Sequence, residues 1–235
     1  MPSLAVFETR HPACDVLGTH RHGDAYAALV LDGSHVEASP DGPIACEPGM
    51  LVLHPRWHAH GNRFGRLGAK VANLELADDD APDELRVLRV PDAREAQAVF
   101  ARAPERLGEL IADCVPVAAP VLHAWQADYL RELRDGELDL STLARRAGVS
   151  AAHASRVFAA SHGMAPQLLR RELRCRRALR LLTGDLPMAD VAALTGFADQ
   201  AHLGRTLRAA TGATPSQLRR KIKSVQDRSD ALRLQ

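Results

Sequence analysis

The stretch Thr195-Gly-Phe-Ala-Asp-Gln-Ala-His-Leu-Gly-Arg-Thr-Leu207 predicts a sharp turn between two helices. Gly196 ends a short apolar helix, because glycine adopts the left-handed backbone that lets a chain leave a helix and turn. Asp199 then offers a side-chain oxygen to the unpaired amides of the next helix. A helix, a tight turn and a capped second helix form the helix-turn-helix plan.

The same pattern occurs forty-nine positions earlier, at residues 146–158. There Gly148 ends an apolar helix and Ser150 is the expected cap of the next one. In both copies the first helix carries an apolar stripe at helical spacing. The recurring pairs are Ser150 and Asp199, His153 and His202, Arg156 and Arg205, Phe158 and Leu207, Gly163 and Gly212, and Pro166 and Pro215.

The second helix of each copy has the composition of a surface that reads DNA. One side is apolar and is predicted to pack inward. The opposite side mixes small residues, which let a helix lie deep in the major groove, with Arg, which can donate two hydrogen bonds to a guanine. Alternatively the two Arg are solvated and the two His contact phosphates or cap local backbone. The candidate DNA-contacting residues are Ala152, His153, Ser155, Arg156, Gln200, Ala201, His202, Arg205 and Arg208.

A helix from Pro166 to about Leu182 connects the two copies. We expect Leu168, Cys175, Leu179 and Leu182 to form its buried stripe, surrounded by Arg. A rigid connector would hold the recognition helices about 34 Å apart, the distance between successive major grooves on one face of DNA; the Arg run is otherwise a solvated face.

After the second copy, Thr214, Pro215 and Gln217 form a capping box with Pro at the first helical position. The basic helix that follows includes Arg219, which we expect to contact phosphates and so to weaken binding to all sequences alike when replaced.

This half of the chain resembles the DNA-binding domain of the AraC family of bacterial transcription regulators. The resemblance covers about residues 124–222 and rests on the two copies described above, on Gly163 and Gly212, and on Thr214-Pro-Ser216. Leu207 stands where the family usually has Phe, and the first recognition helix is rich in Ala, with fewer polar groups to read bases. The resemblance implies a regulator of promoter DNA that is a homodimer and contacts RNA polymerase.

Charge divides the chain in the same way. Residues 125–235 hold 19 Lys and Arg against 11 Asp and Glu, a net charge of +8, whereas residues 1–124 hold 11 against 18, a net charge of −7. A basic half favours phosphates. The chain of 235 residues is long enough for two domains, lacks a signal peptide or a long apolar run, and has four scattered Cys, so we expect a soluble cytoplasmic protein with no membrane partner.

The first half reads as short strands separated by Gly and Pro turns. Strands are expected at 25–31, 36–38, 44–46, 50–53 and 69–76, which is the rhythm of a small antiparallel barrel. The predicted class is therefore α+β with two domains, a β-barrel with appended helices and an all-α double helix-turn-helix. The barrel resembles a cupin, through the His20-Arg-His22 pattern, Gly33 and the run from Gly49 to Asn62.

A small organic effector is expected in the mouth of this barrel. Its hydrogen-bonding groups would be His20, His22, Tyr26 and His60. The alternative is a transition metal such as Zn, Fe or Ni on His20, His22 and His60. Metal-binding cupins carry Glu at the position of Tyr26, and Asn62 fits the pattern only if His58 is the ligand, so we favour a site without metal. His54, Trp57 and His58 are assigned either to the barrel rim or to binding.

The boundaries expected are a barrel at 1–90, a helical appendage and linker at 91–119, the DNA-binding domain at 120–222 and a basic, polar tail at 223–235. Helices over 91–115 either pair subunits or pack back onto the barrel. The sequence thus predicts a transcription regulator, not an enzyme, that senses a small molecule. The alternatives are a metal-dependent cupin enzyme with a helical tail and a constitutive regulator whose barrel only dimerises.

Overall fold

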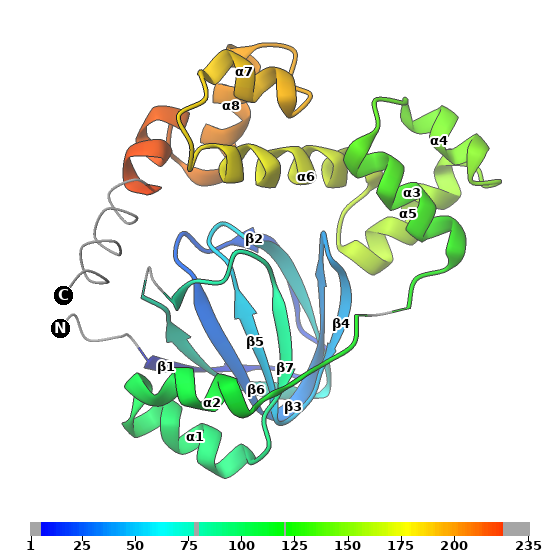
Figure 1. The fold of residues 1–235 in the computed structure, drawn as a ribbon. Coiled ribbons are helices and arrows are strands. Elements are labelled where there is room, and N and C mark those ends of the chain that lie inside the picture. Colours follow the sequence, from blue (N-terminus) through cyan, green and yellow to red (C-terminus); the bar gives the residue numbers. More distant parts are fainter. Residues whose placement is uncertain (1–5, 78–79, 120, 223–235) are drawn as a thin grey trace. The chain divides into compact units, whose positions relative to one another are not determined.

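The computed structural model describes residues 6–77, 80–119 and 121–222, and the chain divides into two compact units, residues 1–120 and 121–235 (Figure 1). The first unit is a sheet with appended helices and the second is helical, which confirms the α+β class. The tail expected at 223–235 lies outside the described residues. Among the helices of the described ranges, none combines the length and the apolar character needed to span a bilayer.

The first unit contains an antiparallel sheet with the strand order β1-β6-β3-β5-β7-β8, to which β2 is added by pairing with β6 and β4 by pairing with β3. The strands are β1 (Val6–His11), β2 (Val16–Arg21), β3 (Tyr26–Ser39), β4 (Gly42–Cys46), β5 (Met50–His54), β6 (Ala59–Glu75), β7 (Arg86–Arg89) and β8 (Val115–Pro116).

The long strands β3 and β6 run through both halves of this sheet. The first part of β3 pairs with β5 and with the end of β6, and its second part pairs with β4 and with the start of β6. Both strands shift where turns were expected, at Asp32-Gly33 and at Gly65–Gly68. Gly33 and Gly68 each have a φ of +70°, and a Cβ on Gly33 would lie 2.1 Å from the Gly68 carbonyl oxygen. These glycines bend continuous strands, so the prediction of separate strands at 25–31 and 36–38 was wrong.

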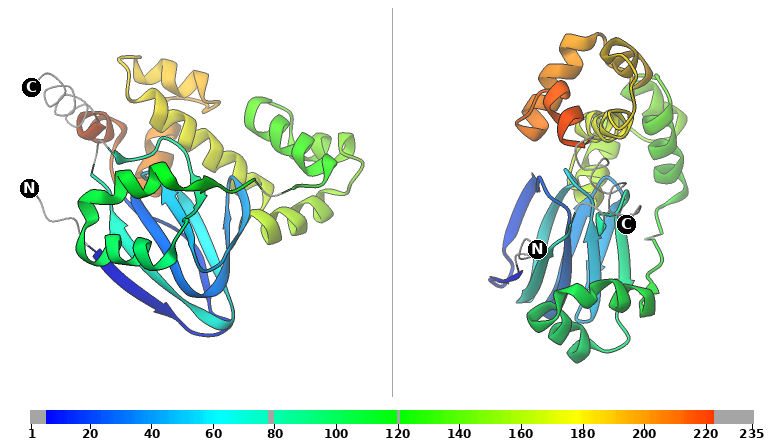
Figure 2. Two further views of the ribbon diagram at one scale, coloured as in Figure 1. Left: turned by 60° about the horizontal axis from the view of Figure 1, so that its bottom comes forward. Right: turned by 60° about the vertical axis from the view of Figure 1, so that its left-hand side comes forward.

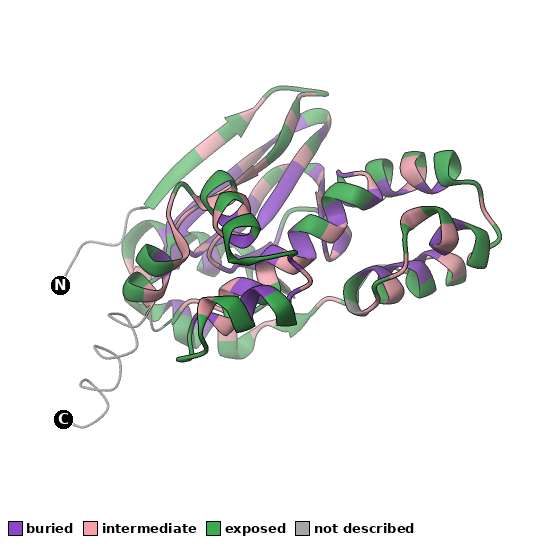
Figure 3. Ribbon diagram, turned by 90° about the horizontal axis from the view of Figure 1, so that it is seen from above, coloured by how far each residue is buried: buried purple, intermediate pink, exposed green. Residues whose placement is uncertain are grey.

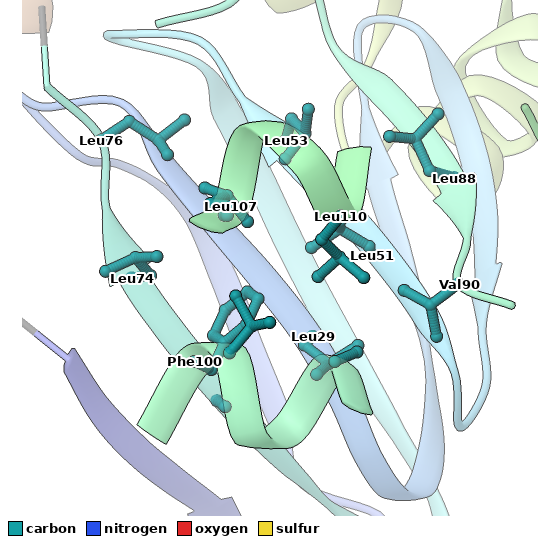
Figure 4. Close-up of a cluster of buried hydrophobic side chains, with 14 of the residues drawn as sticks. Leu29, Leu51, Leu53, Leu74, Leu76, Leu88, Val90, Phe100, Leu107 and Leu110 are labelled. Atoms are coloured by element: carbon teal, nitrogen blue, oxygen red, sulfur yellow. The ribbon is translucent and has the colours of Figure 1, made fainter. Parts of the chain in front are cut away.

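Successive side chains of β3 point to opposite faces of the sheet. One face is covered by helices, and the other lines a cavity that is described below. Ala27 and Leu29 belong to a core cluster that also contains Phe100 of α1 (Ala93–Arg102) and Leu110 of α2 (Leu107–Asp113), two helices linked by the 3₁₀ turn η2 (Pro104–Arg106). Figure 2 shows these helices against the sheet, and Figure 4 shows the apolar side chains between them. Of the two roles considered for this segment, the structure shows packing onto the sheet; a role in pairing subunits stays a prediction.

The second unit repeats its local structure along the chain. Its helices are α3 (Ala124–Asp135), α4 (Leu140–Arg146), α5 (Ala151–His162), α6 (Pro166–Leu181), α7 (Met188–Leu194) and α8 (Gln200–Thr211), and residues 215–222 are helical as well. The bounds of α8 are those of α5 displaced by forty-nine residues. In Figure 1, α7 and α8 lie toward one end of α6, and α3, α4 and α5 lie toward the other.

The buried stripe predicted for the connector α6 is confirmed in part: Cys175 and Leu182 are buried and Leu179 is half-buried, but Leu168 is not part of it. Leu168 is 46% exposed, whereas its neighbour Leu169 is fully buried together with Ala178. The helix contacts α3 and α5, which precede it in the chain, and α7, which follows it. Because it packs against several helices, its buried surface is broader than the single stripe that a periodicity argument assumes.

Candidate DNA-binding surface and ligand cavity

Both helix-turn-helix turns have the geometry that their sequences predict. Gly148 and Gly196 adopt φ values of +70° and +74°. The Ser150 hydroxyl accepts a hydrogen bond from the His153 backbone N–H at 3.1 Å, and the Asp199 carboxylate accepts one from the His202 N–H at 2.6 Å. Each second helix therefore starts at a fixed point relative to its turn.

The inward faces of α5 and α8 anchor them in the unit. Phe158 is fully buried and its ring lies 5.0 Å from that of Tyr129, while Leu207, at the equivalent position of the second copy, is also fully buried. The smaller Leu thus occupies the same core position as Phe. Helices of this unit carry buried residues along one side and exposed residues along the other (Figure 3).

The outward faces of α5 and α8 carry the residues predicted to contact DNA. Each is exposed except Ser155, which is half-buried. The His153 ring lies 5.6 Å from the Trp125 ring, and the His202 ring packs edge-on against Phe197 at 5.2 Å. Both His are therefore held beside an aromatic side chain at the start of a recognition helix, and both Arg of the repeat, Arg156 and Arg205, are exposed.

A second repeated pair, Arg170 and Arg219, was missed as a pair although it has the same forty-nine-residue spacing. Arg170 donates from Nη2 to the Leu138 carbonyl oxygen at 2.5 Å, and Arg219 donates to the Leu186 carbonyl oxygen at 2.6 Å. Each bond links the helix that follows one helix-turn-helix copy to the loop before the first helix of that copy. The phosphate contact expected of Arg219 stays a prediction, and the same guanidinium has a structural task in binding the backbone.

The first unit encloses a cavity of about 260 Å³. His20, His22, Tyr26 and His60, the four residues predicted to bind an effector, all line it, and they come from β2, β3, β6 and the loop after β2. The lining also includes apolar side chains from both halves of the sheet, among them Phe64 and Val52, so the sheet curves around this space.

The aromatic and imidazole rings of the cavity are in close contact. The Tyr26 hydroxyl lies 3.1 Å from His60 Nε2, within hydrogen-bond distance, and the His20 and His60 ring centroids are 4.4 Å apart. Burial raises the pKa of the Tyr26 hydroxyl well above its usual range. Burial also lowers the pKa of His60 to about 3, and the pKa of the more exposed His22 is lowered by partial desolvation and by the neighbouring His20 and His54. At neutral pH, His22 and His60 are therefore uncharged and Tyr26 keeps its proton.

Glu37 and His54 form a buried pair in this cavity that the sequence reasoning did not assign. His54 Nε2 donates to the two Glu37 carboxylate oxygens at 3.1 and 2.9 Å, and both side chains are almost completely buried. Burial acts to raise the pKa of Glu37, but the charge and the hydrogen bond of His54 outweigh it, so the pKa is lowered. Glu37 lies two positions from His35, so the two side chains point to the same face of the strand, and both line the cavity. His54, for which a place at the rim and a binding role were both considered, lines the cavity as well.

Two groups of three side chains in this cavity have the residue types and spacing of a metal site. They are His20, His22 and His60, and Glu37, His54 and His60, and in each group the ligand atoms lie within 4.8 Å of one another. The first group matches the metal alternative that the sequence left open. Both contain His60, so the two groups overlap.

Two capped helix-turn-helix units joined by one helix define a DNA-binding domain of the double helix-turn-helix class. Residues 143–221 match a family model described as a helix-turn-helix domain. This part of the chain is an AraC-type DNA-binding domain.

Curated relatives extend the match. The transcriptional activator NphR of a Rhodococcus species is 34% identical over 185 residues, which are 74% of this chain and 52% of NphR. The HTH-type transcriptional regulator GlxA of Rhizobium meliloti is 38% identical over 85 residues, or 36% of this chain and 26% of GlxA. This chain thus spans about half of the first relative and about a quarter of the second.

Among solved structures, ToxT of Vibrio cholerae, crystallised with an unsaturated fatty acid, is similar at a TM-score of 0.41 and 10% identity. The match covers 93% of this chain and 95% of the ToxT chain.

Proposed function

We propose that this protein is a sequence-specific DNA-binding transcription regulator that uses α5 and α8 as its recognition helices. The observation that carries the proposal is the repetition, within one unit, of a capped helix with a buried apolar face and an exposed Arg on its opposite face. Spacing, capping and exposure are all reproduced in the second copy, as expected of two elements with the same task.

The exposed residues of the two recognition helices differ, and so do the contacts that they can make. The exposed face of α8 carries Gln200, Arg205 and Arg208, whereas α5 offers Arg156 among Ala residues. Arg and Gln donate to base edges in the major groove, while Ala contacts mainly thymine methyl groups. We therefore assign most of the base discrimination to α8 and mainly positioning contacts to α5.

Footprinting the purified full chain on genomic promoter fragments tests this function. The expected result is protection of discrete sites that span adjacent major grooves on one face of the DNA. Inserting about five base pairs, half a helical turn, between the two contacted segments should abolish specific binding, because α6 fixes the separation of the recognition helices. Binding that tolerates the insertion, or protection without any sequence preference, contradicts the proposal.

We further propose that the first unit senses a small-molecule effector in its 260 Å³ cavity. The combination of apolar walls with convergent His and Tyr groups is typical of ligand pockets. Regulation requires that the effector bind two states of the protein with different affinity. The partners that we propose are promoter DNA, this effector, a second copy of the chain and RNA polymerase.

Thermal melting of the full chain with a panel of metabolites tests the sensor. A ligand at a hundred times its dissociation constant adds about 2.7 kcal/mol of apparent stability. The shift should be lost in Tyr26→Phe, which removes the hydroxyl beside His60, and kept in Leu67→Ser, which alters an exposed side chain of the same unit. A constitutive regulator whose first unit only dimerises would show no ligand-dependent shift.

A further inference from the structure

The carboxylate of Glu37 is the starting point, because it lies inside the first unit with almost no exposure. Glu37 is 2% exposed, and burying an ionised carboxylate is costly unless positive charge or strong hydrogen bonds oppose it. The hydrogen bonds to this carboxylate that the described residues provide come from His54.

The surrounding imidazoles leave nitrogen atoms without hydrogen bonds. Nδ1 of His54 and Nδ1 of His60 are both buried and find no hydrogen-bond partner among the described residues. Buried polar atoms in this condition need an explanation. A metal ion takes one nitrogen of an imidazole and thereby fixes which nitrogen keeps the proton, and an ion between Glu37 and His54 would take the place of the proton on His54 Nε2. His54 and His60 have 1% and 2% exposure, so bulk water does not supply the missing contacts.

We propose that Glu37, His54 and His60 bind one divalent transition-metal ion in the floor of the cavity. Each offers a ligand atom, and the three atoms lie within 4.8 Å of one another. The residues come from β3, β5 and β6, so hydrogen-bonded strands hold them in place. Two imidazoles and one carboxylate are a ligand set that suits Zn²⁺, Fe²⁺, Co²⁺ or Ni²⁺.

Charge and burial favour this group over His20, His22 and His60. A dication beside Glu37 is partly neutralised by a ligand that carries negative charge, whereas three neutral imidazoles provide none. His22 is exposed, while all three members of the deeper group are buried. Because both groups use His60, a single ion occupies one or the other. Glu37, His54 and His60 also line the cavity, so an ion held by them would be accessible to a ligand that enters it.

Cobalt binding by the full chain tests the site without DNA or effector. After removal of metal with a chelator, titration with CoCl₂ should give one Co²⁺ per chain, measured by elemental analysis, and a visible absorption band. Glu37→Gln should weaken binding at least tenfold, since even loss of an outer partner of a metal ligand costs about that much. His35→Gln is the matched control, because His35 is a buried imidazole that lines the same cavity but belongs to neither group.

His22→Gln separates the two groups of ligands. The proposal expects it to bind Co²⁺ as the unchanged chain does. Loss of binding in His22→Gln with retention in Glu37→Gln places the ion on the His20 group and overturns the proposal, as does failure of the folded, unchanged chain to bind Co²⁺. If circular dichroism shows that Glu37→Gln does not fold, His54→Gln decides by the same measurement. DNA binding is independent of this result, so its presence or absence leaves the proposed regulator function to its own test.

Discussion

Exposed Arg on the second recognition helix is the feature whose role can be measured most directly. Arg205→Ala should cost about 1–3 kcal/mol at one base pair and relax the preference there, because its two donors are suited to one guanine edge. The measurement is binding of the full chain to its operator and to single-base variants of it.

A charge-matched control accompanies this change. Arg220 is exposed in the helix that follows the second helix-turn-helix copy, and Arg220→Ala should weaken binding to operator and random DNA to the same extent. Equal losses on specific and random DNA for Arg205→Ala would remove its assigned role in reading bases.

His35 predicts how the first unit responds to acid. Burial lowers its pKa to about 4 from the ordinary value of 6.5, with Glu37 acting in the opposite direction. Between these values the unfolded chain binds the proton and the folded chain does not, so stability falls as pH falls below about 6.5. With a chelator present, one such histidine should remove about 2 kcal/mol of unfolding free energy between pH 7 and pH 5.

The check is the free energy of unfolding of the first unit at several pH values. His35→Gln should reduce this acid loss by its own share, whereas His123→Gln, at an exposed position of the other unit, should leave it unchanged. An unchanged pH dependence in His35→Gln would mean that the folded state already accepts this proton.

Single-residue signals predicted the cavity only in part. The His20-Arg-His22 pattern and His60 were visible in the sequence because histidines at alternate strand positions point to one side. Glu37 was not, because an acidic residue between Val36 and Ala38 is expected on the exposed face of a strand, whereas in the structure His35 and Glu37 are on the buried face. Its role depends on His54, which is distant in the sequence. In the sheet Glu37 is paired with Ile44 and Asn62 and His54 with Tyr26, so the two side chains meet across the cavity because the sheet curves.

At the scale of elements, the cap of α8 controls how its recognition surface is formed. The Asp199 carboxylate accepts the His202 N–H, so Asp199→Ala should cost about 1 kcal/mol of stability and lower affinity for the operator. Asp199→Asn should restore most of both, because Asn is an equally good cap. Stability by chemical denaturation and operator affinity are to be measured on the same preparations; a loss in Asp199→Asn equal to that in Asp199→Ala would contradict a capping role.

Helices were predicted more fully than strands, for a physical reason. Caps, Gly stops and the forty-nine-residue repeat are local signals, so α5 and α8 could be placed from the residues within and beside them. The bends in β3 and β6 depend on a non-local contact between Gly33 and Gly68, and in the sequence the same glycines signal turns. Strands β1 and β2, which are exposed along much of their length and pair with β6, carry too little apolar alternation to be recognised.

For the whole molecule, the division into units coincides with the division of charge. Residues 1–120 hold 11 Lys and Arg against 18 Asp and Glu, and residues 121–235 hold 19 against 11. One unit therefore repels phosphates while the other attracts them, and a near-neutral chain has a strongly basic DNA-binding unit. This arrangement favours binding to DNA through the second unit alone.

Salt is therefore expected to act on the complex through the basic unit. If the two recognition helices and their flanking residues contact about six to ten phosphates, operator affinity should fall at least about a thousandfold between about 50 and 200 mM salt. Arg220→Ala should reduce the slope of log affinity against log salt by about one, as loss of one phosphate contact requires. Arg89→Ala, which removes an exposed positive charge from the acidic unit, should leave the slope unchanged. An equal change of slope in both variants would show that net charge, and not contact by the second unit, determines the attraction to DNA.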